Sequence, residues 1–186
     1  MNERMSWEEN GNILKEAKKN ETLAYVTRSD LKSSPYMILS CLFEYCHALI
    51  FLDKNKQTGT MGHLDVDTWP EHILSGWAGS YNEGHTVKKV QDIYEKPEDV
   101  KVMHIYHKNI NLSPNKNQPY NWRYTKENIE EELAKRGFTE VEHLEIYPDG
   151  KHSICRDMVL DVKASKVLVF PDNEKVHLSI PFFEDQ

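Results

Sequence analysis

Residues 46–65 contain a cysteine and a histidine that are either a nucleophile and its base or ordinary core residues of a buried hairpin. The stretch reads CHALIFLDKNKQTGTMGHLD, with Cys46 before one apolar run and His63 near the end of a second. A neighbouring imidazole lowers the pKa of a thiol from about 8.5 toward neutrality, and the thiolate is the nucleophilic form. Two apolar runs joined by a polar loop predict a β-hairpin, so its register decides whether the two side chains meet.

The register depends on where the turn is centred. A two-residue turn at Lys54 and Asn55 places Cys46 directly opposite His63. Directly opposed residues have Cβ atoms about 4.5–5.5 Å apart, close enough for a thiol–imidazole contact. If the pairing register shifts by two residues, Cys46 and His63 stay on one face of the sheet as diagonal neighbours. If it shifts by one residue, the two side chains lie on opposite faces and the hairpin is an ordinary one. On the favoured register His47 points to the other face and is the poorer base.

The other candidate residues have weaker patterns. Cys41 and Cys155 are expected to be core or rim residues. His104 and His107 form an H-x-x-H pair, but positions three apart on a strand face opposite ways, so the sequence predicts no metal site. Asp65 shares the strand parity of His63, and a role on its face is left open. Surface or core-edge positions are expected for His47, His72, His85 and His152.

Composition limits the class of protein. The chain has 186 residues, enough for one domain with a full hydrophobic core. Its formal charge of -7 argues against nonspecific nucleic-acid binding. No apolar run approaches the roughly 20 residues of a membrane span, and the N-terminus lacks a secretory signal. Three cysteines suit free thiols better than a disulfide framework, so a cytoplasmic location is expected, with export as an effector also compatible.

Strand-length apolar runs outnumber helical segments. Helices are expected over residues 7–20, 86–95 and 125–136, the last of them after Thr125 as N-cap and before Gly137. Strands are expected over 22–27, 36–41, 46–52, 58–65, 100–107, 140–147, 153–162 and 166–170. The sequence therefore predicts an α+β fold, a single layered domain whose mostly antiparallel sheet packs with two to four helices.

The segment around Cys46 and His63 resembles the chemoreceptor glutamine deamidase family (CheD). Members have a Cys, an apolar strand ending in Asp, and a His 17 residues after the Cys, like CHALIFLD and GTMGH here. A hydroxyl residue lies six before the Cys, at the position of Ser40. N-terminal asparagine amidohydrolase is similar in the same segment. This chain has FEYC where the family has LGSC, and GTMGH where it has GGMAH.

The resemblance covers roughly residues 36–170 and implies a CheD-like deamidase domain there. Residues 1–35 are expected to form an N-terminal helix, strand and loop. Residues 171–186 are expected to be a C-terminal extension of the same single domain.

The activity implied by the resemblance is that of a cysteine-dependent protein amidohydrolase, which deamidates a Gln or Asn side chain through a thioester. Cys46 is the implied nucleophile, His63 its base, and Ser40 the residue that orients the histidine. Backbone N–H groups of Tyr45 and Cys46 are candidates to hold the oxyanion. The reaction needs no metal or cofactor, its partner is a protein substrate, and the oligomeric state is left open.

Two alternatives remain at this stage. One is a catalytically inactive module that keeps the fold and binds a partner protein. The other is a Cys–His peptidase or transglutaminase, which shares the thioester chemistry but needs a longer substrate cleft.

Overall fold

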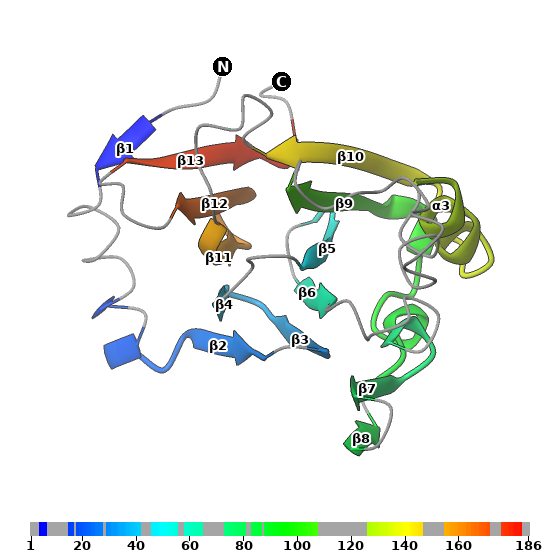
Figure 1. Ribbon diagram of the computed structural model, residues 1–186. Helices are drawn as coiled ribbons and strands as arrows, with labels where there is room; N and C mark the ends of the chain where they lie inside the picture. Colours follow the sequence, from blue (N-terminus) through cyan, green and yellow to red (C-terminus); the bar gives the residue numbers. More distant parts are fainter. Residues whose placement is uncertain are drawn as a thin grey trace, which may run out of the picture.

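The computed structural model of the chain consists of two large sheets packed face to face and a small separate hairpin (Figure 1). It describes residues 4–6, 15–16, 18–27, 29–41, 46–55, 58–64, 73–80, 83–86, 88–107, 126–146, 155–171 and 176–183. In that part of the chain, no helix has the length and apolar character needed to cross a bilayer.

The first large sheet has six strands and includes both the earliest and the latest strands of the chain. In spatial order they are β1 (Arg4–Ser6), β13 (Val176–Pro181), β12 (Lys166–Pro171), β11 (Cys155–Asp161), β4 (Met37–Cys41) and β2 (Leu23–Val26). Neighbours are antiparallel except β2 and β4, which run parallel. Strands β2 and β13 therefore pair with strands of residues 36–171, whereas β1 pairs with β13.

The second large sheet has five strands. In order they are β10 (Glu140–Ile146), β9 (Val100–His107), β5 (His47–Asp53), β6 (Gly59–Leu64) and β3 (Asp30–Ser34). Only β9 and β10 are parallel, and the connection between them includes the helix α3 (Lys126–Ala134). The remaining elements are the hairpin β7 (Trp77–Ser80) and β8 (Glu83–Thr86) and the 3₁₀ turns η1 (Val90–Asp92) and η2 (Pro97–Asp99).

Strand β5 is buried on both faces. Ala48, Ile50 and Leu52 face the six-stranded sheet and pack into a core shared with its residues. Leu49 and Phe51 face the opposite way, into a second core closed by apolar residues of α3. This two-sided burial explains why β5 reads as an unbroken apolar run in the sequence rather than as an alternating pattern.

The α+β class and the predominance of antiparallel pairing are confirmed. The expected single sheet is wrong, because the inner face of β5 needs a cover and a second sheet provides it. Helix α3 lies within the predicted range of 125–136, and Gly137 ends it with a φ of 87°. Of the two to four expected helices, α3 is the one fully bounded within the described residues.

Two local expectations are also wrong. The predicted helix over 86–95 is the end of β8 followed by the single turn η1, with Val90 and Tyr94 buried without a continuous helix. Residues 28–35, expected to be a loop, contain β3. Its polar residues Lys32 and Ser33 are exposed, because β3 is an edge strand. An edge strand can form without an apolar alternation that would reveal it in the sequence.

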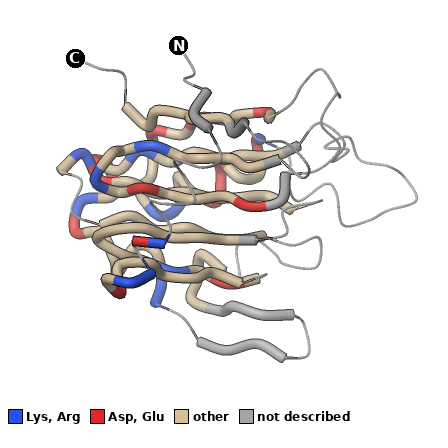
Figure 2. Tube along the Cα trace, turned by 90° about the vertical axis from the view of Figure 1, so that its left-hand side faces the viewer, with Lys and Arg blue, Asp and Glu red and all other residues tan. Residues whose placement is uncertain are grey.

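Charged residues of both signs are interspersed along the described part of the chain (Figure 2). Some of them pair between neighbouring strands of the five-stranded sheet. Lys101 Nζ lies 2.8 Å from a carboxylate oxygen of Glu142, and Lys54 Nζ lies 3.4 Å from one of Glu140. These pairs connect the parallel edge strand β10 to β9 and to the turn after β5.

Gly59, at the start of β6, sets how closely the two sheets approach. A Cβ on this residue would lie 2.5 Å from Val162 Cγ2 and 2.7 Å from Leu160 Cδ2. Both side chains are fully buried and therefore have little room to move.

We expect Gly59→Ala to lower the free energy of unfolding by about 1–3 kcal/mol, because the added methyl group overpacks the core between the sheets. Urea denaturation monitored by circular dichroism measures the change. Asn55→Ala, in the exposed turn before β6, is the matched control and should change stability by less than about 0.5 kcal/mol. Equal effects from the two substitutions would contradict the packing argument.

Candidate active site

Ser40 and His63 meet between the two large sheets. Ser40 Oγ, on β4, lies 2.8 Å from Nδ1 of His63, on β6. The two residues are 1% and 0% exposed, so this hydrogen bond is fully desolvated. Ser40 Oγ also donates a hydrogen bond of 2.9 Å to the backbone carbonyl of Val26, on β2. The histidine ring is therefore positioned by a residue of the opposite sheet.

The partners of Ser40 determine the tautomer of His63. A serine hydroxyl has one proton, and here the Val26 carbonyl accepts it. Ser40 Oγ must then act as acceptor toward the ring, so the proton of the neutral imidazole is on Nδ1. Nε2 consequently has the lone pair and is the nitrogen of His63 that can accept a proton.

Cys46 lies on the same face of the sheet as His63. Ala48 pairs directly with His63, and Cys46 precedes Ala48 by two residues, so Cys46 and His63 are diagonal neighbours. Diagonal neighbours are separated by about 7–8 Å, a distance that an aromatic ring can span. Cys46 is a thiol, is 4% exposed and packs in the core between the sheets.

The expected direct pairing of Cys46 with His63 is wrong by two residues. The loop between β5 and β6 is longer than two residues, because β5 ends at Asp53 and β6 begins at Gly59. The backbone N–H of Thr58 donates a 3.2 Å hydrogen bond across this loop to Asp53 Oδ2. A shift of two preserves the face, so the thiol and the imidazole still point into the same core.

Some predicted site residues lie outside the described part of the chain or are placed only by their strand. Tyr45 and Asp65 are outside it, so the oxyanion role of Tyr45 and the role of Asp65 stay predictions. Cys41 ends β4, and Cys155 begins β11.

Asp30 is a site residue that the sequence did not reveal. It pairs directly with His63 across β3 and β6 and is 4% exposed. Its Oδ1 accepts a 2.7 Å hydrogen bond from the N–H of Leu31, and its Oδ2 lies 3.5 Å from Lys32 Nζ. A carboxylate on this face favours a protonated imidazole beside it. The only sequence signal for Asp30 was a polar stretch that resembled a loop.

A second buried polar system lies on the opposite face of the five-stranded sheet. His47 Nδ1 is 2.7 Å from His104 Nε2, and His104 Nδ1 is 2.9 Å from His143 Nδ1. The chain of contacts ends at Glu130 of α3, whose Oε1 lies 3.0 Å from His143 Nε2. We call His47, His104, His143 and Glu130 the histidine row.

The inner members of the histidine row are neutral. Burial lowers the pKa of His47 to about 3. Burial, together with the nearby His47, His143 and Lys126, holds the pKa of His104 well below its usual 6.5. The expectation that His47 is a surface or core-edge residue is therefore wrong. These contacts join β5, β9 and β10, and only the order of strands in the sheet could have revealed them.

The row does not have the geometry of a metal site. His104 uses its two ring nitrogens for two different neighbours, so the three rings do not converge on one point. Within the described residues, no group of three His, Cys, Asp or Glu side chains could hold a metal ion.

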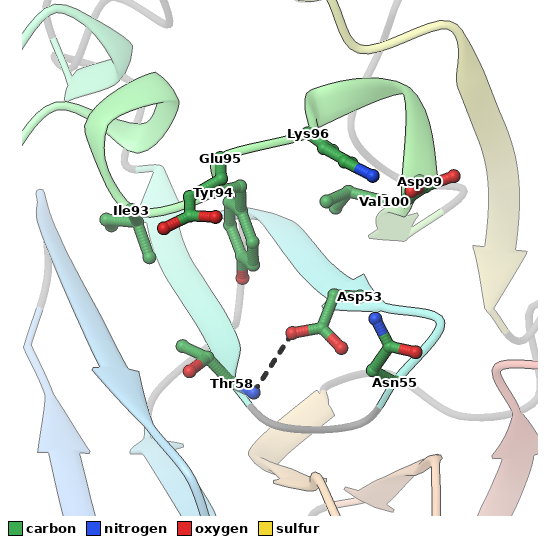
Figure 3. Close-up of a pocket in the computed structure, with 9 residues that line it drawn as sticks. All are labelled: Asp53, Asn55, Thr58, Ile93, Tyr94, Glu95, Lys96, Asp99 and Val100. Atoms are coloured by element: carbon green, nitrogen blue, oxygen red, sulfur yellow. Dashed lines mark hydrogen bonds between the residues drawn. The ribbon is translucent and has the colours of Figure 1, made fainter.

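A surface hollow of about 410 Å³ lies at the other end of β5 from Cys46 (Figure 3). Strand β5 has seven residues, so at about 3.3 Å per residue the hollow is roughly 20 Å from the thiol. It is therefore separate from the site at Ser40, Cys46 and His63. Its lining residues are Asp53, Asn55, Thr58, Ile93, Tyr94, Glu95, Lys96, Asp99 and Val100.

Comparison with known proteins gives a partial structural likeness and no sequence family. No family model and no curated protein matches the chain. The hypothetical protein YfiH of Bacillus licheniformis is 12% identical, with a TM-score of 0.43 over 67% of this chain and 54% of that one. The DUF152 protein NMB0706 of Neisseria meningitidis is 8% identical, with a TM-score of 0.43 over 71% and 67%. The chain thus spans about half the length of YfiH.

The expected relationship to the CheD deamidases, and with it to N-terminal asparagine amidohydrolase, is wrong. No family model matches, and the structural neighbours are YfiH and a DUF152 protein. The resemblance depended largely on the spacing of Cys46 and His63, which an antiparallel hairpin with a loop of this length can produce in any family. The chemistry of the site therefore has to be judged from the geometry of its own residues.

The buried histidines predict a pH dependence of stability. In the unfolded chain a histidine binds a proton below about pH 6.5, whereas folded His47 stays neutral down to about pH 3. The unfolded state therefore binds more protons in this window, and the free energy of unfolding falls as the pH is lowered.

Each of His47 and His104 should contribute up to about 1.4 kcal/mol per pH unit to this fall. Urea denaturation between pH 6.5 and 5, above the range in which ordinary carboxyl groups titrate, measures the slope. His104→Phe should flatten the slope by about half, whatever its effect on stability at pH 7. A wild-type stability that is flat over this range would show that the buried rings accept protons freely.

Proposed function

We propose that the chain is a cysteine-dependent protein amidohydrolase that deamidates a Gln or Asn side chain through a thioester on Cys46. The hydrogen bond between Ser40 Oγ and His63 Nδ1 is the observation that supports this most directly. It holds the ring in the tautomer whose Nε2 can accept a proton, on the face of the sheet that also bears the thiol. The same hydrogen bond meets the polar requirement of a buried ring, so the test of function is the reactivity of the thiol beside it.

In the first half of the proposed reaction, His63 Nε2 takes the proton of the Cys46 thiol. The thiolate attacks the carbon of the primary amide, and the carbonyl oxygen becomes an oxyanion, with the backbone N–H groups of Cys46 and Tyr45 as candidate donors. The imidazolium then protonates the amide nitrogen. The carbon–nitrogen bond breaks, ammonia leaves, and the thioester remains on Cys46.

In the second half, His63 Nε2 removes a proton from water, and the resulting hydroxide attacks the thioester carbon. The carbon–sulfur bond breaks, and the proton returns to the sulfur. The net change is amide plus water to carboxylate plus ammonium. Asp30 directly opposes His63 and stabilises the imidazolium that forms in both halves.

The burial of the site supports a slender substrate group. Cys46 is only 4% exposed and His63 is fully buried. A primary carboxamide at the end of a methylene chain is narrow enough to approach such a thiol, whereas a main-chain peptide bond has substituents on both sides. This difference favours deamidation over peptide-bond cleavage.

Activation of the thiol can be measured without knowing the substrate. In wild type, we expect iodoacetamide to label Cys46 well below pH 8, because His63 stabilises the thiolate. His63→Ala should return labelling to the pH range of an ordinary thiol. Ser40→Ala should shift it part of the way, and Ser40→Thr, which keeps the hydroxyl, should not. Peptide mass spectrometry reports each cysteine separately, so Cys41 and Cys155 are internal references. A Cys46 that labels identically in all four proteins would overturn its assignment as an activated nucleophile.

Turnover is tested by ammonia release from a panel of glutamine- and asparagine-containing proteins and peptides. Cys46→Ser should abolish release in a protein that is still folded, because the two side chains have almost the same size; circular dichroism verifies the fold, and a lower thermal unfolding midpoint is expected where the buried hydroxyl lacks a full set of hydrogen bonds. Cys41→Ser is the matched control and should stay active. Activity retained in Cys46→Ser would exclude the thioester mechanism. Backbone cleavage in place of ammonia release would identify a peptidase, and binding without turnover in wild type would identify a noncatalytic module.

A further inference from the structure

We propose that the histidine row is a proton relay, which exchanges a proton between the interior position of His47 and the surface at Glu130 without leaving a charge inside the protein. This inference goes beyond the proposed hydrolase and does not depend on it. It is based on the three contacts of 2.7, 2.9 and 3.0 Å that link His47, His104, His143 and Glu130 in an unbroken series.

The position of each proton follows from the outer end of the row. The Glu130 carboxylate can only accept, so His143 Nε2 donates to it and His143 Nδ1 has the lone pair. His104 must then donate from Nδ1 to His143, which leaves His104 Nε2 as the acceptor for Nδ1–H of His47. All protons of the neutral row therefore point toward Glu130, and the lone pair of the inner end is on His47 Nε2.

Uptake of one proton reverses this order. A proton added to Nε2 of His47 allows its Nδ1 proton to move to His104 Nε2, and the Nδ1 proton of His104 to move to His143 Nδ1. One proton enters and two shift by one hydrogen bond each, so His47 and His104 end as neutral rings in the opposite tautomer. The positive charge appears on His143, beside the Glu130 carboxylate.

The surroundings favour the charge at the outer end and oppose it at the inner end. His47 and His104 are 1% and 0% exposed and contact other imidazole rings in the row, whereas the His143 side chain, 8% exposed, lies 3.0 Å from the carboxylate of Glu130, which is 55% exposed. Lys126 disfavours a charge on His104. Its ammonium lies 6.0 Å from the ring centroid of Tyr106, and that ring lies 5.1 Å from the ring of His104 in a tilted contact. On β10, Glu145 is two residues after His143 and therefore on the same face as the row.

The inner end of the relay lies close in the chain to Cys46 and His63. His47 follows Cys46 directly and pairs with Leu64, which follows His63. The relay therefore ends one residue from both, on the other face of the same two strands. It provides this end of the sheet with a path along which a proton can leave for solvent while the core stays uncharged.

The relay is tested by the ring-nitrogen chemical shifts of the full chain labelled with ¹⁵N, followed from neutral to acidic pH. At neutral pH we expect His47 and His104 to be protonated on Nδ1 and His143 on Nε2. On acidification His143 should become an imidazolium, and both buried rings should change to Nε2–H with the same midpoint. Buried rings that keep Nδ1–H while His143 titrates, or a charged His47, would overturn the proposal.

Variants at the outer end of the row test the coupling. Glu130→Gln removes the charge beside His143, so the midpoint of the joint tautomer change of the two buried rings should move to a lower pH. Glu127→Gln, on the exposed face of α3, is the matched control and should leave it in place. His143→Phe should abolish the tautomer change of His47 and His104, and a change that persists in this variant would also overturn the relay. Backbone amide spectra verify that each variant is folded.

Discussion

Burial of strand β5 on both faces is the constraint on which the rest of the structure depends. One face requires the six-stranded sheet as a cover, and the other requires α3 and its neighbours. Polar side chains on β5 and on the strands beside it therefore lie in dry surroundings, where an unmet hydrogen bond costs about 1–3 kcal/mol. The serine and histidine contacts on both faces meet this requirement, and in doing so they fix the tautomers of the rings.

On the two faces of the five-stranded sheet, buried histidines obtain their hydrogen bonds from different kinds of group. On the inner face, a neutral hydroxyl from β4 orients His63 and contributes no charge. On the outer face, a carboxylate at the surface orients three rings in series. The first arrangement fixes the tautomer of a single ring on β6. The second links rings on β5, β9 and β10 in an unbroken series that ends at the surface, which is the basis of the proposed relay.

Local patterns predicted α3 and the more apolar strands, because their apolar spacing and the stop at Gly137 are encoded within short segments. They did not predict β1, β3, β13 or the hairpin of β7 and β8. The face shared by Cys46 and His63 was also predictable, since a register error of two preserves strand parity. Local patterns could not predict the second sheet, the position of Asp30 opposite His63 or the histidine row. Each depends on which strands lie side by side, as when β9 places His104 between His47 and His143, and pairings across such long separations leave no local signal.

Ser40 and His63 belong to different sheets, and this has a consequence for the order of folding. Strand β4 is held between β2 and β11, and β11 begins only at Cys155. Contacts between residues so distant in the chain form slowly, and during synthesis they cannot form until the later strand has left the ribosome. The nascent protein therefore contains Cys46 for most of its synthesis before the sheet that positions its imidazole can close. The hydrogen bond that fixes the tautomer of His63 therefore forms only when the fold is nearly complete.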